Sequence, residues 1–180
     1  KLSRMKPDCM TLDLVMQDED GLSILKTVMR DHPLPVVILS ALAKKDAEIT
    51  FRCLAAGAVG FVPKPSGELS LDIEKIKPQL LETVKAVSQV SRGKLKPLKL
   101  HRLKSPKRPW TQLHKIIVMG ASTGGPQTVE AILASLPEDF PAPLLVIQHM
   151  PSPFFTESFA ERLNQNCHLR VKVARDQESV

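Results

Sequence analysis

Up to Val90, the chain alternates between short apolar runs and stretches in which apolar residues recur every three or four positions. The second spacing is that of a helix with one buried face. Glycine favours the end of a helix, as at Gly57, and proline inside a helix, as at Pro78, kinks or divides it. The predicted helices are Leu22–Arg30, Lys45–Ala56 and Leu71–Val90. The predicted strands are Cys9–Val15, Pro35–Ser40 and Val59–Val62.

The same alternation returns from residue 115 onwards. The predicted strands there are Ile116–Met119, Pro143–Gln148 and His168–Ala174. The predicted helices are Gln127–Leu136 and Phe154–Asn164. Strands that alternate with helices form parallel sheets with helices on both faces. The predicted fold class is therefore α/β, with blocks at residues 1–91 and 115–180 and a linker at residues 92–114.

The basic charge of the chain is concentrated around this linker. Of 25 basic residues, ten lie between Thr83 and Val129, where no acidic residue occurs, so that 15 basic and 19 acidic residues remain elsewhere. A nucleic-acid-binding domain carries its charge on a folded face. This segment contains prolines and little glycine, so we expect a solvated linker and no nucleic-acid partner.

Composition argues against several other classes of protein. No apolar run approaches the roughly 18 residues that a membrane span needs, and no apolar segment follows the polar start Lys1–Asp8 as it would in a signal peptide. The cysteines Cys9, Cys53 and Cys167 are odd in number and lack the spacing of zinc ligands. We expect reduced thiols, a cytoplasmic location and no membrane insertion.

The segment Lys115–Pro126, KIIVMGASTGGP, carries the strongest chemical signal. Ser122 lies on a glycine-rich turn between a predicted strand and a predicted helix, where its hydroxyl is exposed and helix N–H groups point towards it. This placement suits a nucleophile whose product is an oxyanion. The alternative is a glycine turn in which Ser122 is an ordinary helix N-cap.

His149 directly follows the next predicted strand. A strand–helix–strand unit has parallel strands, which place Ser122 and His149 at the same carboxyl edge of a sheet. There His149 can accept the serine proton as a general base. The alternative is a histidine that only bonds to backbone at a strand end, and the neighbouring serine disfavours it.

Three polar residues stand at strand ends in the first block: Asp13, Ser40 and Lys64. On a parallel sheet they share one edge. There the carboxylate can attack phosphorus, the hydroxyl can bond a phosphoryl oxygen and the ammonium can offset its charge. Taken singly, each has a structural alternative: a turn cap, a strand end or a surface charge. Together they predict a site that accepts a phosphoryl group.

These residues stand in segments that resemble two known kinds of domain. The segments that resemble a response-regulator receiver domain, which is flavodoxin-like, are Thr11–Leu14, Asp20-Gly21, Pro35–Ser40 and Gly57–Pro65. Gly120–Pro126 and Gln148–Pro151 resemble the catalytic domain of the chemotaxis protein-glutamate methylesterases, the CheB family. The implied architecture is part of a receiver linked to the N-terminal part of a doubly wound parallel α/β esterase domain.

The esterase resemblance implies hydrolysis of glutamate methyl esters on methyl-accepting chemoreceptors, and deamidation of receptor glutamines in many members. It implies Ser122 as the nucleophile, His149 as its base and Thr123 beside the oxyanion site. Gly124 and Gly125 complete the turn. No cofactor is expected for this chemistry.

The receiver resemblance implies regulation by phosphorylation. Asp13 would accept the phosphoryl group from a chemotaxis histidine kinase, with Ser40 as the switch hydroxyl and Lys64 as the charge partner. Mg²⁺ would bind at Asp13 and at the backbone carbonyl of Val15 in the complete protein. Phosphorylation would relieve a blockage of the esterase site by the receiver.

The chain departs from the family pattern locally and at both ends. Val15 and Gln17 stand where members often have an acidic residue and a proline. The acidic pair that holds Mg²⁺ has no counterpart, and the family pattern puts the aspartate of the triad beyond residue 180. Asp139 and Asp176 fit surface acids. We expect an internal part of a longer protein that folds poorly and lacks esterase activity by itself.

Three other functions are weighed against this one. A response regulator with a non-catalytic binding domain would show a helix-turn-helix-like pattern after the linker, whereas strands and helices alternate there. A generic serine α/β-hydrolase normally has its acid between serine and histidine, and His149 comes only 27 residues after Ser122. A nucleotide-binding turn needs a Walker lysine or Gly-x-Gly-x-x-Gly spacing, and neither is present.

Overall fold

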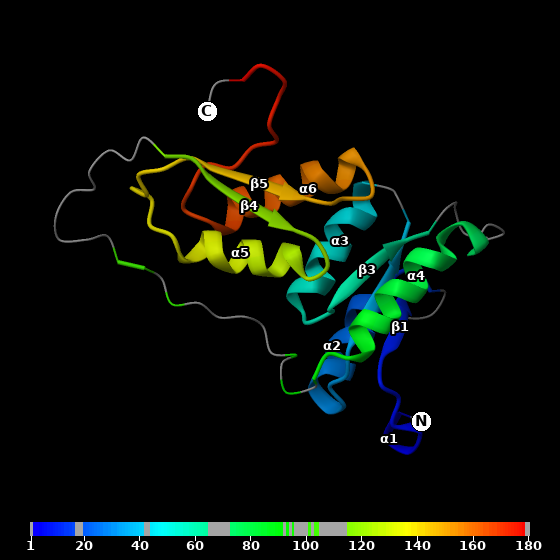
Figure 1. The fold of residues 1–180 in the computed structure, drawn as a ribbon. Helices are drawn as coiled ribbons and strands as arrows, with labels where there is room; N and C mark the ends of the chain where they lie inside the picture. Colours follow the sequence, from blue (N-terminus) through cyan, green and yellow to red (C-terminus); the bar gives the residue numbers. More distant parts are fainter. Residues whose placement is uncertain are drawn as a thin grey trace. The chain divides into compact units, whose positions relative to one another are not determined.

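A computed structural model describes residues 2–16, 20–41, 44–64, 73–91, 93, 95, 101, 103–104 and 115–178 (Figure 1). The chain divides into two compact units, Lys1–Pro97 and Leu98–Val180. Most of the predicted linker, residues 92–114, lies outside the described residues, so its boundaries stay a prediction. Among the described helices, none is long and apolar enough to cross a membrane.

The first unit is built on a three-stranded parallel sheet. Its strands are β1 (Met10–Asp13), β2 (Val36–Ser40) and β3 (Gly60–Pro63), which lie in the order β1-β2-β3. Its helices are α1 (Leu2–Met5), α2 (Gly21–Asp31), α3 (Lys44–Ala55) and α4 (Ile73–Ser88). The sequence predicts all of these elements except the one-turn helix α1.

Side chains alternate along β2 between two helical layers. Val37 belongs to a buried cluster with Ile76 and Val87 of α4. Ser40 lies on the opposite face, where it hydrogen-bonds to Thr50 of α3. Helix α2 packs against α3, so α2 and α3 cover one face of the sheet and α4 covers the other (Figure 1). The prediction of a parallel sheet with helices on both faces is confirmed for this unit.

Gly57 is predicted to end one helix and Pro78 to kink or divide another. Gly57 follows α3 with φ +113°, a left-handed conformation that favours glycine, and its N–H donates to the carbonyl of Leu54 at 3.0 Å. The predicted C-cap is therefore confirmed. Pro78 lies inside the single helix α4 and does not divide it. Pro78 is exposed, and the N–H that it lacks would have bonded Glu74 in the first turn.

The second unit is a parallel pair of strands with two helices. The strands are β4 (Ile117–Ala121) and β5 (Leu144–Gln148), and the helices are α5 (Gly125–Ser135) and α6 (Pro153–Asn166). Arg162 of α6 donates two hydrogen bonds of 2.8 Å to the carboxylate of Glu130 on α5. This bidentate ion pair, partly shielded from solvent, fixes the two helices against each other.

The faces of this second sheet differ in exposure. Ala121 and Gln148 point to the side on which α5 begins, because both approach Gly125. On the other face, the side chains of Val118, Leu145 and Ile147 are exposed.

The predicted strand His168–Ala174 is not formed. All of its residues are described, and none pairs with β4 or β5. The N–H of Val171 donates instead to Oδ1 of Asn164 at 2.9 Å. Alternating apolar and basic residues decide which way side chains point, but a strand also needs a neighbour that completes its hydrogen bonds. The prediction of a strand in this segment is therefore wrong.

Gly21 allows α2 to begin directly against the end of β1. A Cβ atom at this position would lie 2.6 Å from the carbonyl oxygen of Asp13 and 2.9 Å from the Cα of Leu14. Both are backbone atoms, which cannot move aside as the tip of a side chain does. Asp20 caps the helix by accepting the N–H of Leu22 at 3.3 Å. Gly21 therefore determines how closely α2 approaches the strand that carries Asp13.

We predict that Gly21→Ala lowers the free energy of unfolding by about 1–3 kcal/mol, the usual cost of forcing an extra group into a packed site. The measurement is urea unfolding followed by circular dichroism. Gly93→Ala is the matched control, because the only described atom that its added Cβ would meet is the Oγ of Ser91, at 3.9 Å. Equal unfolding midpoints for the two variants would contradict the prediction.

Candidate active site and phosphoryl-acceptor site

Ser122 begins the turn that joins β4 to α5. The N–H of Gly125 donates to the carbonyl of Ser122 at 2.7 Å and closes this turn, while Gly124 adopts φ +73°. Gly124 is the N-cap of α5, and no side-chain hydrogen bond caps the helix. The interpretation of Ser122 as a capping serine is therefore wrong. The Ser122 side chain is exposed.

Ser122 and His149 occupy neighbouring positions at the carboxyl edge of the second sheet. Ala121 and Gln148 are paired in the register of β4 and β5, and each is followed by one of the two predicted residues. The N–H of His149 donates to the carbonyl of Ala121 at 3.4 Å. Both side chains are exposed, and the described contacts include no direct hydrogen bond between them. The structure therefore has Ser122 and His149 at the same carboxyl edge of the sheet, as the sequence predicts.

The same turn presents backbone donors next to the serine. The N–H of Gly125 is bonded to Ser122, whereas the described contacts show no hydrogen bond from the N–H groups of Thr123 and Gly124. The Thr123 side chain is also exposed. N–H groups beside a nucleophile can stabilise negative charge that develops on a substrate oxygen.

Gln148 makes contacts that the sequence does not predict. Its Nε2 donates to the carbonyl of Ser122 at 3.2 Å and to the carbonyl of His149 at 3.1 Å. Its Oε1 is buried and has no hydrogen-bond partner among the described residues. Gln148 belongs to the segment Gln148–Pro151, but a glutamine at a strand end gives no sign of which carbonyl groups it will meet.

The thiols of Cys53 and Cys167 are poor nucleophiles and do not compete with this pair. Burial raises the pKa of the Cys53 and Cys167 thiols to about 11, so that roughly one thiol in ten thousand is ionised at pH 7. Asp139 and Asp176 are both exposed, as predicted for surface acids.

Asp13 and Lys64 form an ion pair at the edge of the first sheet. The Nζ of Lys64 lies 2.8 Å from Oδ2 of Asp13, and the two side chains are 13% and 35% exposed. The other carboxylate oxygen accepts the N–H of Val15 at 3.1 Å. Asp13 ends β1 and Lys64 follows β3, so the fold joins residues 51 positions apart. Two of the three residues predicted for phosphoryl chemistry are therefore in contact.

Ser40, the third of these residues, has its hydroxyl turned towards α3. Its Oγ accepts a hydrogen bond from Thr50 at 2.8 Å and donates to the carbonyl of Ala41 at 3.2 Å. Within the described residues this hydroxyl bonds to neither Asp13 nor Lys64, although the backbone N–H of Lys64 donates to the carbonyl of Ser40 at 2.7 Å. The sequence gives no sign of Thr50 as a partner, because the face that a helix turns to a sheet depends on packing.

A magnesium site is not complete in the described part of the chain. No group of three or more His, Cys, Asp or Glu side chains there is placed to hold a metal ion. Asp13 offers a single carboxylate, which Lys64 and the Val15 N–H already engage. These residues alone do not fit the six oxygen ligands that Mg²⁺ prefers. Metal binding at Asp13 and the Val15 carbonyl stays a prediction.

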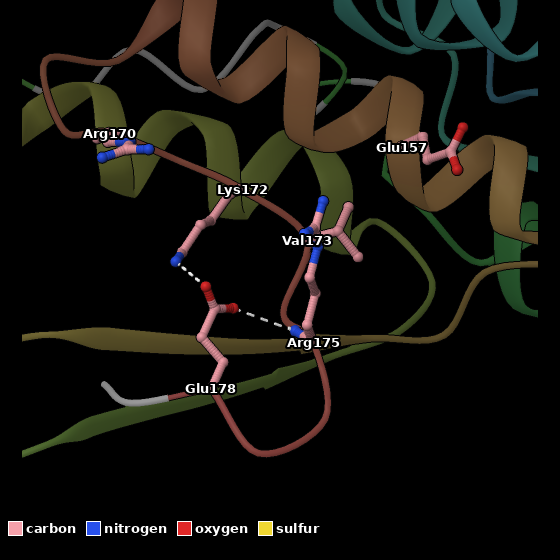
Figure 2. Close-up of a pocket in the computed structure, with 6 residues that line it drawn as sticks. All are labelled: Glu157, Arg170, Lys172, Val173, Arg175 and Glu178. Carbon is pink, nitrogen blue, oxygen red and sulfur yellow. Dashed lines mark hydrogen bonds and ion pairs between the residues drawn. The ribbon is translucent and has the colours of Figure 1, made fainter.

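A pocket of about 550 Å³ lies beside α6 and is lined largely by the segment that follows this helix (Figure 2). Glu178 reaches across it, contacting Lys172 and accepting the N–H of Arg175 at 3.2 Å. The hydrogen bond from Lys172 is the main reason why the pKa of Glu178 lies below its usual value, and the bond from the Arg175 N–H adds to it. Neither Ser122 nor His149 lines the pocket, so it is separate from the predicted ester site.

Two family models match the chain. The model for the response regulator receiver domain matches residues 1–74, and the model for CheB methylesterase matches residues 117–180. The first match contains Asp13, Ser40 and Lys64, and the second contains Ser122 and His149.

Several curated proteins are similar to this chain over its full length. The protein-glutamate methylesterase/protein-glutamine glutaminase of Halalkalibacterium halodurans is 43% identical to this chain, and those of Thermotoga maritima and Archaeoglobus fulgidus are each 41% identical. Each alignment covers 100% of this chain and 52% of the relative. The chain therefore spans about half the length of the curated relatives that it matches.

Among solved structures, the response regulator domain of Thermotoga maritima CheB is 36% identical in sequence. The match covers 50% of this chain and 67% of that chain, with a TM-score of 0.46. The family assignment rests on the sequence matches, which extend over both units. The chain belongs to the CheB family, with response regulator receiver sequence followed by CheB methylesterase sequence.

Proposed function

We propose that the full gene product hydrolyses glutamate methyl esters on methyl-accepting chemoreceptors and releases methanol. The observation that carries this proposal is the position of Ser122 and His149, directly after the paired residues Ala121 and Gln148, within sequence that matches CheB methylesterase. The relatives are also named protein-glutamine glutaminase, and we propose deamidation of receptor glutamines as a second reaction at this site.

The proposed reaction uses the Ser122 hydroxyl, the His149 ring and backbone N–H groups of the turn that follows β4. The Ser122 hydroxyl attacks the ester carbonyl and passes its proton to the His149 ring, while the N–H groups of Thr123 and Gly124 stabilise the oxyanion. Methanol leaves with the proton from His149, and the glutamyl group remains esterified to Ser122. Water, deprotonated by His149, then hydrolyses this ester and restores both residues. With glutamine, ammonia leaves in place of methanol.

Regulation is proposed to act through the first unit. Asp13 would accept a phosphoryl group from a phosphohistidine of a chemotaxis kinase in the cytoplasm, and Lys64 would offset the added charge. The ion pair between these residues and the receiver match support this assignment. Phosphorylation would then relieve a blockage of the esterase site.

The carboxylate that orients His149 is predicted to lie beyond residue 180.

We predict that Ser122→Ala lowers methanol release from methylated receptor at least about a thousandfold, because the attacking oxygen is lost. Ser135→Ala is the matched control: its hydroxyl bonds to the carbonyl of Ile132 near the opposite end of α5, so it should remain as active as the wild type. Release at the wild-type rate by Ser122→Ala would exclude Ser122 as the nucleophile.

His149→Ala is expected to reduce methanol release by a comparable factor. The double variant Ser122→Ala/His149→Ala should be no slower than Ser122→Ala, because a nucleophile and its base act as one unit. His168→Ala, which changes another exposed histidine, serves as the control. Losses that multiply in the double variant would show that the two residues act independently.

Asp13→Asn is expected to prevent phosphorylation and to abolish the stimulation of methanol release by a phosphodonor. The amide cannot attack phosphorus as the carboxylate does. Phosphorylation is followed by the mass of the intact protein, and activity by methanol release in the presence of the kinase. Asp8→Asn, at an exposed aspartate of the same unit, should behave as the wild type. A phosphorylated Asp13→Asn variant would sink the assignment.

A further inference from the structure

We propose that Gln148 is a positioning residue that holds the Ser122 turn and the His149 segment in one arrangement. This inference rests on the proposed ester hydrolysis, since both concern the same site. A single side-chain amide donates to the backbone carbonyl groups of both residues, at 3.2 Å to Ser122 and 3.1 Å to His149. Gln148 itself has no role in the proposed bond-making steps.

The ladder of backbone hydrogen bonds between β4 and β5 does not by itself hold Ser122 and His149 firmly in place. The last paired residues are Ala121 and Gln148, so Ser122 and His149 lie just past the ladder. One backbone bond continues there, from the N–H of His149 to the carbonyl of Ala121, and it is long at 3.4 Å. The two bonds from the Gln148 amide are shorter, and they act on the segments beyond the ladder. Gln148 therefore extends the connection to the residues that react.

The orientation of the amide is dictated by its partners. Carbonyl oxygens accept hydrogen bonds, so the NH₂ group and not Oε1 must face Ser122 and His149. The opposite orientation would place Oε1 against two other acceptors. As a consequence, Oε1 is buried without a described partner. An unpaired buried acceptor is unfavourable. This orientation nevertheless keeps the two hydrogen bonds that the NH₂ group donates.

Gly125 makes room for this side chain. A Cβ atom at position 125 would collide with Oε1 of Gln148 and would lie 2.9 Å from its Cδ and from the Cβ of Ala121. Any larger residue at position 125 must therefore displace the amide. The glycine that begins α5 and the glutamine that ends β5 form one steric unit, although they belong to different motifs in the sequence.

The first test compares Gln148→Ala and Gln148→Met in the full gene product. Both remove the donors, and methionine keeps most of the volume. We expect kcat for methanol release to fall about 10- to 100-fold, with KM within about twofold of the wild type, because small misplacement of reacting groups slows chemistry more than binding. Gln165→Ala, at an exposed glutamine of α6, is the matched control. A wild-type kcat in folded Gln148→Met would overturn the proposal.

The second test uses Gln148→Glu and pH. A protonated carboxyl group has one O–H donor, whereas a carboxylate has none and repels the two carbonyl groups. The ratio of kcat for Gln148→Glu to kcat for the wild type should therefore rise as pH falls through the pKa of the new carboxyl group. The corresponding ratio for Gln148→Met should stay constant. A constant ratio for both variants would contradict a role for the donated hydrogen bonds.

A third measurement separates this inference from the proposed reaction. Hydrogen exchange of the Gly125 amide, which donates to the carbonyl of Ser122, should be at least about fivefold faster in Gln148→Met than in the wild type, with α6 unchanged. If Ser122→Ala retains activity, the proposed reaction fails and this exchange rate alone decides the role of Gln148. Unchanged exchange would then refute it. If Ser122→Ala is inactive while Gln148→Met matches the wild type in both kcat and exchange, only the positioning role fails.

Discussion

Parallel pairing of adjacent strands is the constraint on which both candidate sites depend. In a parallel pair, the carboxyl ends of the strands meet at one edge, so that residues far apart in sequence become neighbours. The pairing of Ala121 with Gln148 sets the positions of Ser122 and His149. A shift of this register by one residue would separate them and turn every side chain of one strand to the other face.

The carboxyl edges of the two sheets differ in the charges that they carry. In the first unit the edge holds opposite charges, since Asp13 and Lys64 are in contact and partly buried. That arrangement suits a group that must carry added negative charge. In the second unit the Ser122 and His149 side chains are exposed, and the surrounding polar groups are backbone N–H groups and the amide of Gln148. That arrangement suits an oxyanion that forms only briefly, for which fixed dipoles are sufficient.

Where prediction from the sequence failed, the missing information was a partner. The segment His168–Ala174 has the alternation of a strand but no neighbouring strand in the described chain. Pro78 is predicted to kink or divide its helix, and the division does not occur, because α4 continues past it. The alternative interpretation of Ser122 as a helix N-cap also fails, because Gly124 takes the N-cap position. In each case a correct local property did not decide the outcome.

Apart from α1 and the segment His168–Ala174, the sequence by itself determined the order of strands and helices and which residues stand at strand ends. Those two facts are local, because they follow from apolar spacing and from glycine-rich turns, and they were enough to bring Ser122 near His149 and Asp13 near Lys64. The tertiary structure alone decided that Ser40 bonds to Thr50 and that Gln148 bridges two carbonyl groups. Such contacts depend on strand register and on how each helix is rotated against its sheet, and neither is encoded in local spacing.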